Sequence, residues 1–284
     1  MKKSKRLRNL WYNLSPQQRF TVRRLYYLPS DLYEQFINKR HRYVPPKGYI
    51  YTGSPSNSKE YILQGLHQLE LLKEDIDIKP DDSVLDIGSG IGRTAIALTT
   101  YLNEKGFYEG FDVVEKGVQW CNKKIKKDHS NFNFKYIPLF NDLYNENELE
   151  ASEFKFPYPD NHFDKIFSFS VFTHMKIDEI QHYFSEIKRV LKPDGKAFST
   201  FFVYDDNTEK QIANNEKFSF PYLYDGYRLM SNVVQSGNIA IHKEKLNEML
   251  QNSNLELVSL TEGFWKNKEN SLNEKEYQDI VVFK

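Results

Sequence analysis

Residues 84–93 read Val-Leu-Asp-Ile-Gly-Ser-Gly-Ile-Gly-Arg, an apolar run that ends in Asp86 and enters a turn with glycines at 88, 90 and 92. Glycine is needed where a backbone bends sharply and brings its N–H groups close to a ligand, because a Cβ would obstruct that approach. The residues that follow predict a helix to about Leu102, whose positive N-terminal end faces the same place. The stretch therefore predicts a strand, a nucleotide-binding turn and a helix.

The acid before the glycines distinguishes this turn from the dinucleotide fingerprint Gly-x-Gly-x-x-Gly, which cradles a pyrophosphate. The carboxylate of Asp86 would repel a pyrophosphate but attract a ligand that carries ammonium and sulfonium charge, as S-adenosylmethionine does. The Asp-x-Gly-x-Gly-x-Gly spacing resembles the first motif of the class I S-adenosylmethionine-dependent methyltransferases, which implies cofactor contacts from Asp86, Gly88, Ser89 and Gly90. A glycine turn that only packs a helix on a sheet is the alternative.

A second short strand, Tyr-Glu-Gly-Phe-Asp-Val-Val at 108–114, also contains an acid at its end. This acid, Asp112, follows Asp86 by 112 − 86 = 26 positions, which leaves room for one helix and a turn. At that separation an acid on the neighbouring strand can accept hydrogen bonds from both ribose hydroxyls. The resemblance implies this role for Asp112, with Val113 beside it. A helix N-cap for a segment that begins near Lys116 is the alternative.

The third motif is Phe-Pro-x-x-Asp-x-x-Phe-Asp at 156–164, followed by a run that ends in Ser-Val-Phe-Thr-His-Met at residue 175. We expect a turn, a strand and an active-site loop. In the resembled family the end of this strand lies beside the transferable methyl, which makes Ser170 a candidate cofactor contact. His174 is a candidate general base, because the reference pKa of histidine is about 6.5. A hydrogen-bonded structural histidine is the alternative.

One position departs from the resembled family. The family usually places an Asp at the end of the third strand, where it accepts a hydrogen bond from the adenine amino group, and this chain has Pro138 there. Asp142 and Glu153 are the candidates to replace that carboxylate. Leu139 and Phe140 could pack on the face of the adenine.

Helical and strand periodicities alternate along the rest of the chain. They predict an α/β, Rossmann-like fold with a seven-stranded doubly wound sheet, and the resemblance implies the methyltransferase version of it. We expect a helical N-terminal extension and lid over 1–80 and a methyltransferase core over 81–284. Within a loop at 49–58, the stretch Tyr51-Thr52-Gly53-Ser54 could close over the cofactor, and a simple surface loop is the alternative. Further elements are predicted as helices at 59–73, 178–191 and 242–251, and strands at 196–204, 255–260 and 277–283.

An insertion over 205–240 interrupts this alternation. Long insertions at the carboxyl edge of a sheet are usually functional, and ligands of open α/β sheets bind beyond that edge. The aromatic segment 218–228 is therefore a candidate wall of the substrate pocket. An oligomer contact is the alternative, since interfaces also favour aromatic residues.

Composition is that of a soluble globular enzyme. The 284 residues are 39% hydrophobic and 27% charged, and no apolar run reaches the ~20 residues that would span a bilayer. The basic start is not followed by the apolar region of a secretory signal. Cys121 is the only cysteine, so no internal disulfide can form and a cytoplasmic protein is expected. The wider run, including Tyr277-Gln278-Asp279-Ile280, resembles an uncharacterised bacterial subgroup of the family, which implies a bacterial protein. No metal site is expected.

The charge is unevenly distributed. Residues 1–48 contain 12 Lys/Arg and 2 Asp/Glu, a net charge of +10, whereas the whole chain is neutral. Aromatic residues alternate with these cations. We favour a helical extension with a solvated basic face and an aromatic face on the core. A surface for nucleic acid or for an acidic partner, such as an acyl carrier protein or anionic lipid, is the alternative, and the binding of such a partner would depend steeply on salt.

The sequence thus predicts an enzyme that transfers a methyl group from S-adenosylmethionine to an O or N atom of a small organic acceptor. The acceptor atom would attack in line behind the methyl carbon. The alternatives are a non-catalytic S-adenosylmethionine-binding module, and a methyltransferase whose macromolecular or carrier-bound substrate docks on the basic N-terminus. A nicotinamide oxidoreductase is disfavoured, because its fingerprint lacks the leading acid.

Overall fold

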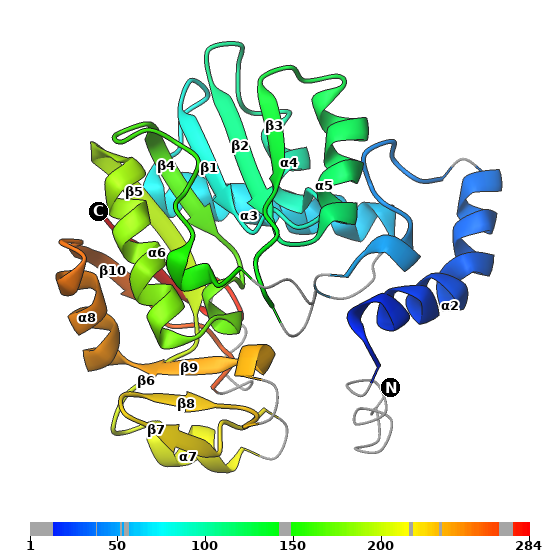
Figure 1. Ribbon diagram of the computed structural model, residues 1–284. Helices are drawn as coiled ribbons and strands as arrows, with labels where there is room; N and C mark the ends of the chain where they lie inside the picture. Colours follow the sequence, from blue (N-terminus) through cyan, green and yellow to red (C-terminus); the bar gives the residue numbers. More distant parts are fainter. Residues whose placement is uncertain are drawn as a thin grey trace.

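A seven-stranded sheet forms the centre of the computed structural model, in the order β10-β11-β5-β4-β1-β2-β3 (Figure 1). Strands β1 to β5 pair in parallel, and β11 is antiparallel to both of its neighbours. The predicted doubly wound sheet is confirmed. Its strands are β1 (Ser83–Ile87), β2 (Phe107–Asp112), β3 (Phe132–Tyr136), β4 (Phe163–Ser168), β5 (Leu191–Phe201), β10 (Leu257–Thr261) and β11 (Asp279–Phe283). The structure describes residues 14–37, 39–51, 53, 57–141, 149–215, 218–232, 235–266 and 275–284.

Helices cover both faces of this sheet and enclose two apolar cores. Successive strand residues point to opposite faces, so Val84 packs in one core and Leu85 in the other. Helices α6 and α8 lie close to the predicted ranges. One face carries α3 (Ser58–Ile76), α4 (Arg93–Leu98) and α5 (Glu115–Cys121), and the other carries α6 (Ile177–Val190) and α8 (Lys243–Asn252).

Helix α4 is shorter than the sequence predicted, because it ends at Leu98 rather than near Leu102. The hydroxyls of Thr99 and Thr100 donate to the carbonyls of Ile96 and Ala97 at 2.7 and 2.8 Å. Such local side-chain bonds compete with the backbone hydrogen bonds of a helix. The glycine turn is therefore followed by a short, fully packed helix.

The insertion folds as a small second sheet in the order β6-β9-β8-β7, which the sequence analysis did not predict. Phe218 and Phe220 pack against Phe202 and Trp265, with ring centroids 5.1 to 6.4 Å apart. These aromatic side chains close a third core of their own. The elements are β6 (Val203–Tyr204), α7 (Glu209–Asn214), β7 (Tyr222–Tyr224), β8 (Tyr227–Leu229), η5 (Gln235–Gly237) and β9 (Ile239–His242).

The N-terminal helix α2 (Pro16–Phe36) lies beside the sheet domain and contacts the short helix η1 (Lys47–Tyr49) (Figure 1). The expected aromatic face on the core is wrong for much of α2, because Tyr26, Tyr33 and Phe36 are exposed. Arg23 donates to the carbonyl of Ile50, and the guanidinium of Arg24 lies 4.9 Å from the ring centroid of Tyr49. A guanidinium is well suited to satisfying carbonyls and stacking on rings, so Arg23 is half-buried, whereas Arg24 remains exposed over its ring. None of the described helices has the length and hydropathy to cross a bilayer.

Candidate cofactor and active site

The glycine turn after β1 has the tight backbone that the sequence predicted. Gly88, Gly90 and Gly92 have φ of 74°, 57° and 85°, the left-handed region that favours glycine. A Cβ on Gly88 would lie 2.4 Å from a methyl carbon of Val171, in the loop after β4. Only glycine fits at this position, so the ends of β1 and β4 can approach each other closely.

Asp112, the last residue of β2, faces this turn. Its carboxylate accepts hydrogen bonds from the N–H groups of Gly90 and Val114, both at 2.8 Å, and from the hydroxyl of Tyr51 at 3.3 Å. Burial raises the pKa of Asp112 to about 6, although these donors favour its charged form. The N-cap alternative is wrong, because the N-cap of α5 is Val114 and makes no side-chain bond.

Asp86 lies on the neighbouring strand and is only 3% exposed. Its carboxylate accepts a hydrogen bond from the hydroxyl of Tyr108 at 2.6 Å. Burial raises the pKa of Asp86 to about 7, the hydrogen bond from Tyr108 opposes this shift, and the charge of Asp112 adds to it. The carboxyl ends of β1 and β2 thus hold two buried acids whose partners are neutral donors.

A cavity of about 230 Å³ opens at these strand ends. It lies where the strand order reverses between β1 and β4, the usual ligand position in an open α/β sheet. Asp142 lies outside the described residues, and Glu153 is exposed and is not among the described lining residues. The other predicted site residues all line the cavity: Asp86, Gly88, Ser89, Gly90, Asp112, Val113, Leu139, Phe140, Ser170 and His174.

His174 ends the short helix η4 (Phe172–His174), which follows β4. Its Nδ1 lies 2.9 Å from the carbonyl oxygen of Ser236 in the insertion. Because a carbonyl only accepts, Nδ1 carries the hydrogen, and Nε2 is the basic nitrogen of the neutral ring. The structure therefore orients the ring in the tautomer that a base at Nε2 requires.

Ser170 adopts a left-handed backbone with φ of 58°, which is uncommon outside glycine. Its N–H donates to the hydroxyl of Thr200 at 2.8 Å, and its own hydroxyl donates to Oε1 of Gln278 at 2.7 Å. These two bonds connect the loop after β4 to β5 and to the residue before β11. The loop that carries His174 is thereby fixed at its first turn.

A family described as a methyltransferase domain matches residues 85–199, the segment from the glycine turn to β5. The chain carries a class I S-adenosylmethionine-dependent methyltransferase domain. S-adenosylmethionine is the cofactor of this domain.

Two methyltransferases of known name and one solved structure are similar to this chain. The ubiquinone/menaquinone biosynthesis C-methyltransferase UbiE of Wigglesworthia glossinidia brevipalpis is 29% identical over 206 residues, which cover 65% of this chain and 72% of that protein. The phosphoethanolamine N-methyltransferase of Plasmodium falciparum is 24% identical over 192 residues, which cover 67% of this chain and 60% of that protein. The PH0226 protein of Pyrococcus horikoshii shares the fold, with a TM-score of 0.53 and 18% identity over 80% of this chain and 92% of that one.

The cavity of this methyltransferase domain fits the cofactor. The glycine turn is a cradle that a Cβ at Gly88 would fill. The hydroxyl of Ser89 is buried at the cavity and has no hydrogen-bond partner within the described part of the chain. The two raised-pKa acids, Asp86 and Asp112, would be stabilised in their charged forms by a cationic ligand.

Tyr51, from the stretch expected to close over the cofactor, lines the cavity, and several further lining residues were not predicted. Arg93 directly follows the glycine turn and so had a local signal. Glu179 and Tyr183 come from α6, and their approach depends on how that helix packs against β4 and β5. Burial raises the pKa of Glu179, which accepts a hydrogen bond from the N–H of Lys176 at 2.8 Å.

Proposed function

We propose that this methyltransferase domain transfers the methyl group of S-adenosylmethionine to an O or N atom of a small organic acceptor. The observation that carries the proposal is the meeting of the glycine turn, two buried acids and an oriented histidine around one cavity. The cofactor supplies an electrophilic methyl on a sulfonium, and in-line attack by an acceptor lone pair breaks the carbon–sulfur bond and yields S-adenosylhomocysteine.

The two acids have separate tasks in this proposal. Asp112 would hold the ribose hydroxyls. Its carboxylate lies at the end of β2 and accepts a hydrogen bond, at 3.3 Å, from the hydroxyl of Tyr51, which also lines the cavity. Asp86 would face the cationic end of the cofactor, because an ionised carboxylate in a buried site interacts strongly with a nearby positive charge. Leu139 and Phe140 would border the adenine.

His174 would take the proton of a hydroxyl acceptor. The carbonyl of Ser236 keeps the hydrogen on Nδ1, so Nε2 accepts the proton while the oxygen attacks the methyl. A neutral amine acceptor needs no base during attack and loses its proton afterwards. The names of the two relatives, a C-methyltransferase and an N-methyltransferase, support methyl transfer and leave the acceptor atom to be measured.

The test is formation of S-adenosylhomocysteine by the full chain in the presence of S-adenosylmethionine and a panel of small hydroxyl and amine acceptors. With a hydroxyl acceptor, we expect His174→Gln to lower kcat by about 100-fold and to remove the acidic limb of the pH profile. His182→Gln is the matched control. His182 lies on α6, its ring bonds the carbonyl of Phe154, and it is not among the described lining residues of the cavity.

Two outcomes would contradict the proposal. Cofactor binding with no S-adenosylhomocysteine formed from any acceptor would favour a non-catalytic binding module. Turnover and a pH profile that are unchanged in His174→Gln would remove the base role and leave the histidine as a structural link to the insertion.

A further inference from the structure

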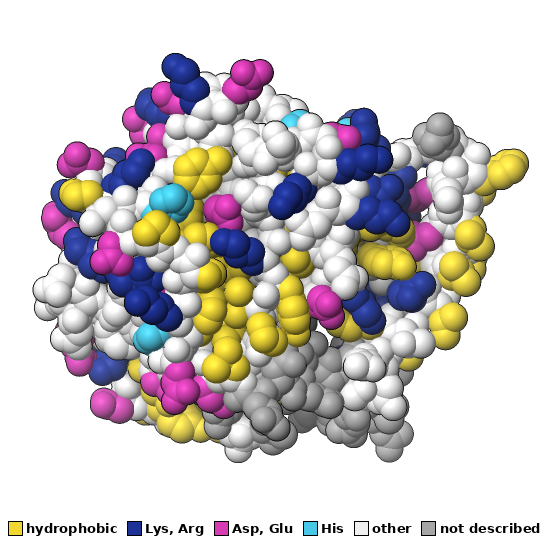
Figure 2. Space-filling model, turned by 45° about the horizontal axis from the view of Figure 1, so that its top comes forward, with side chains coloured by type: hydrophobic (Ala, Val, Ile, Leu, Met, Phe, Trp, Pro, Cys, Tyr) yellow, Lys and Arg dark blue, Asp and Glu magenta, His cyan; other side chains and the backbone are white. Residues whose placement is uncertain are grey.

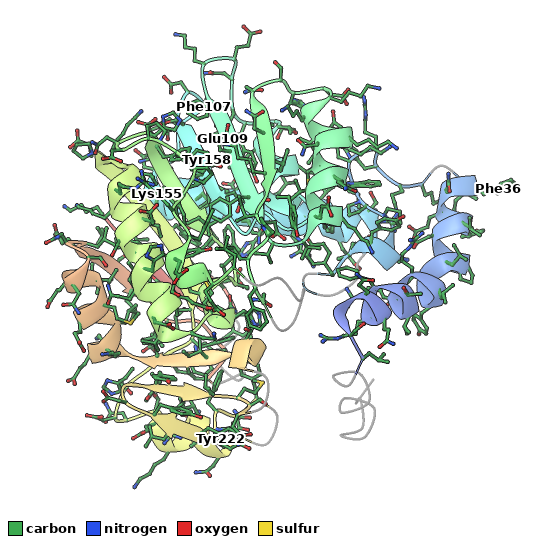
Figure 3. The ribbon with its side chains drawn as sticks, viewed as in Figure 1. Phe36, Phe107, Glu109, Lys155, Tyr158 and Tyr222 are labelled. Atoms are coloured by element: carbon green, nitrogen blue, oxygen red, sulfur yellow. The ribbon has the colours of Figure 1, made fainter. Side chains whose placement is uncertain are left out.

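The outer face of α2 is an unpartnered apolar surface. We define it by seven side chains that are 45–88% exposed: Val22, Leu25, Tyr26, Leu28, Leu32, Tyr33 and Phe36. Phe36 points away from the body of the protein, and hydrophobic side chains gather at this edge of the molecule (Figures 2 and 3). Seven of the fourteen exposed large hydrophobic residues in the described part lie on this one helix, and such concentration marks an interaction site.

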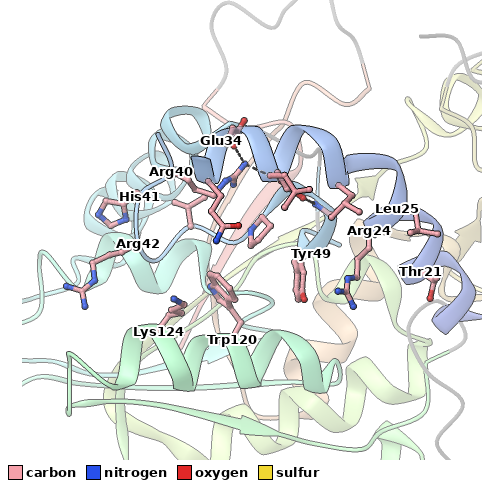
Figure 4. Close-up of a pocket in the computed structure, with 17 residues that line it drawn as sticks. Thr21, Arg24, Leu25, Glu34, Arg40, His41, Arg42, Tyr49, Trp120 and Lys124 are labelled. Atoms are coloured by element: carbon pink, nitrogen blue, oxygen red, sulfur yellow. Dashed lines mark hydrogen bonds and ion pairs between the residues drawn. The ribbon is translucent and has the colours of Figure 1, made fainter. Parts of the chain in front are cut away.

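A positively charged groove of about 680 Å³ lies between α2 and α5, and Leu25, Leu28 and Leu32 of the apolar face form part of its lining (Figure 4). It is the larger of the two cavities described, and it lacks the glycine turn and the acids of the cofactor site. Its cations are Arg24, Arg40, Arg42 and Lys124, and its acids are Asp31 and Glu34.

The two acids of the groove are already engaged. Asp31 accepts hydrogen bonds from the N–H groups of Lys47 and Gly48 at 2.7 and 3.0 Å. Glu34 forms ion pairs with Arg40 and, at 2.6 Å, with Lys47. Arg42 pairs with Asp128, which is not among the described lining residues, so the uncompensated positive charge of the groove is that of two cations.

Two of the cations are placed on aromatic rings instead of on acids. Lys124 lies 5.3 Å from the ring centroid of Trp120, and Arg24 lies over Tyr49. Neither forms an ion pair among the residues that the structure describes. Positive charge beside an exposed apolar helix is the arrangement of helices that lie in a membrane interface.

We propose that the outer face of α2 and the groove cations together dock this protein on an anionic phospholipid bilayer. The apolar side chains would enter the boundary between headgroups and acyl chains, and Arg24 and Lys124 would contact lipid phosphates. The proposal concerns lipid binding and goes beyond the methyl transfer proposed above, because it requires neither cofactor nor acceptor.

Charge favours a bilayer over a second copy of the chain. Residues 14–48 carry 7 Lys/Arg and 2 Asp/Glu, a net charge of +5. A two-fold dimer through α2 would place two such segments side by side, where like charges repel. An anionic surface complements the same charge and also buries the apolar face.

The docking surface is connected to the cofactor site. Phe20 of α2 packs edge to face on Tyr51, with ring centroids 5.6 Å apart, and Tyr51 donates to Asp112. Helix α2, which carries the docking surface, is therefore in contact with a residue that lines the cofactor cavity.

The experiment is co-sedimentation of the full chain with vesicles of phosphatidylcholine alone or mixed with phosphatidylglycerol, without cofactor or acceptor. We expect binding to the anionic vesicles that falls steeply as salt rises. The variant L25S/Y26S/Y33S should lower the partition coefficient by at least about tenfold. The matched control, Y222S/L223S/Y224S, removes the same residue types from the exposed strand β7 of the small sheet and should bind as the parent does (Figure 3).

A second pair of variants tests the charge. R24Q/K124Q should weaken binding to anionic vesicles and flatten its salt dependence, whereas K105Q/K210Q, at exposed positions elsewhere, should leave both nearly unchanged. Thermal unfolding and S-adenosylmethionine binding confirm that each variant is folded.

The proposal is overturned if the parent does not bind anionic vesicles, if it binds neutral vesicles equally well, or if the α2 and β7 variants lose binding alike. It is also overturned if light scattering shows a dimer that L25S/Y26S/Y33S dissociates and the parent shows no vesicle binding. Each of these outcomes leaves the methyl-transfer proposal standing, because that proposal is tested by product formation.

Discussion

Asp164, at the amino end of the central sheet, is in the opposite electrostatic state to Asp86 and Asp112 at the carboxyl end. At the amino end, Asp164 of β4 accepts hydrogen bonds from Lys192 at 2.8 Å and from the N–H of Ser83 at 2.9 Å. Burial tends to raise the pKa of Asp164, but Lys192 and Ser83 outweigh it, and the pKa is lowered. At the carboxyl end, Asp86 and Asp112 are buried with neutral donors, and their pKa values are raised to about 7 and 6.

This difference separates a structural acid from a ligand-binding one. The charge of Asp164 is balanced within the chain, so it contributes to stability without any ligand. The charges of Asp86 and Asp112 are stabilised too little by the chain alone, and a ligand with sulfonium and ammonium groups would complete their environment. The comparison therefore predicts which acids control cofactor affinity and which control only folding.

The largest effect is expected from Asp112→Ala. This change removes the acceptor for the ribose hydroxyls and leaves the N–H groups of Gly90 and Val114 without their partner. We expect the Kd for S-adenosylmethionine to rise by about 100-fold or more, measured by calorimetry at pH 8. A Kd within threefold of the parent would show that the ribose lies elsewhere.

A smaller effect is expected from Asp86→Asn, which removes charge but keeps an acceptor for the hydroxyl of Tyr108. The Kd should rise by about tenfold at pH 8. The Tm of the cofactor-free protein should stay level or rise. At pH 8, above the folded pKa of about 7, Asp86 is ionised in the parent, and its buried charge destabilises the folded state.

The matched control for Asp86→Asn is Asp164→Asn. It loses the ion pair with Lys192, a partly exposed contact worth about 1 kcal/mol or less, so the Tm should fall by roughly 2–4 °C. The Kd should not change. If the two variants behaved alike in both measurements, the distinction between the ends of the sheet would be lost.

The smallest effect concerns the adenine end, where Pro138 occupies the place of an acid. We expect Asp142→Ala to weaken cofactor binding by about five- to tenfold, by loss of one hydrogen bond, and Glu153→Ala to leave it unchanged. Calorimetry on both variants measures which of the two side chains contributes to cofactor binding. Weakened binding in Glu153→Ala alone would reassign the adenine contact.

Much of the central fold could be predicted because it depends on local periodicity. Buried parallel strands such as β1 and β4 are short apolar runs, and the amphipathic helix α6 begins within one residue of its predicted start. The hairpin of β7 and β8 was missed, although Asp225-Gly226 is a common two-residue turn, with φ of 77° at Gly226. The aromatic run before it does not alternate cleanly, so it gave no strand signal.

The site residues that lie at the ends of strands could be predicted from the sequence. Asp86 and Asp112 end neighbouring parallel strands, and those ends meet at one edge of any such sheet. The partner of Asp86, the hydroxyl of Tyr108, and the approach of Glu179 depend on packing between distant segments. The half-buried position of Arg23 on α2 likewise depends on the carbonyl of Ile50 in a loop, which no periodicity reveals.

The most direct test of the account is the number of protons exchanged when S-adenosylmethionine binds. Because a cationic ligand favours ionised carboxylates, and the pKa values of Asp86 and Asp112 are about 7 and 6, binding at pH 6.5 should release protons. Calorimetry in buffers of different ionisation enthalpy should show a net release of about 0.5–1 proton, reduced in Asp86→Asn. Binding with no proton release, or with proton uptake, would contradict the claim that a cationic cofactor stabilises the charged forms of these two acids.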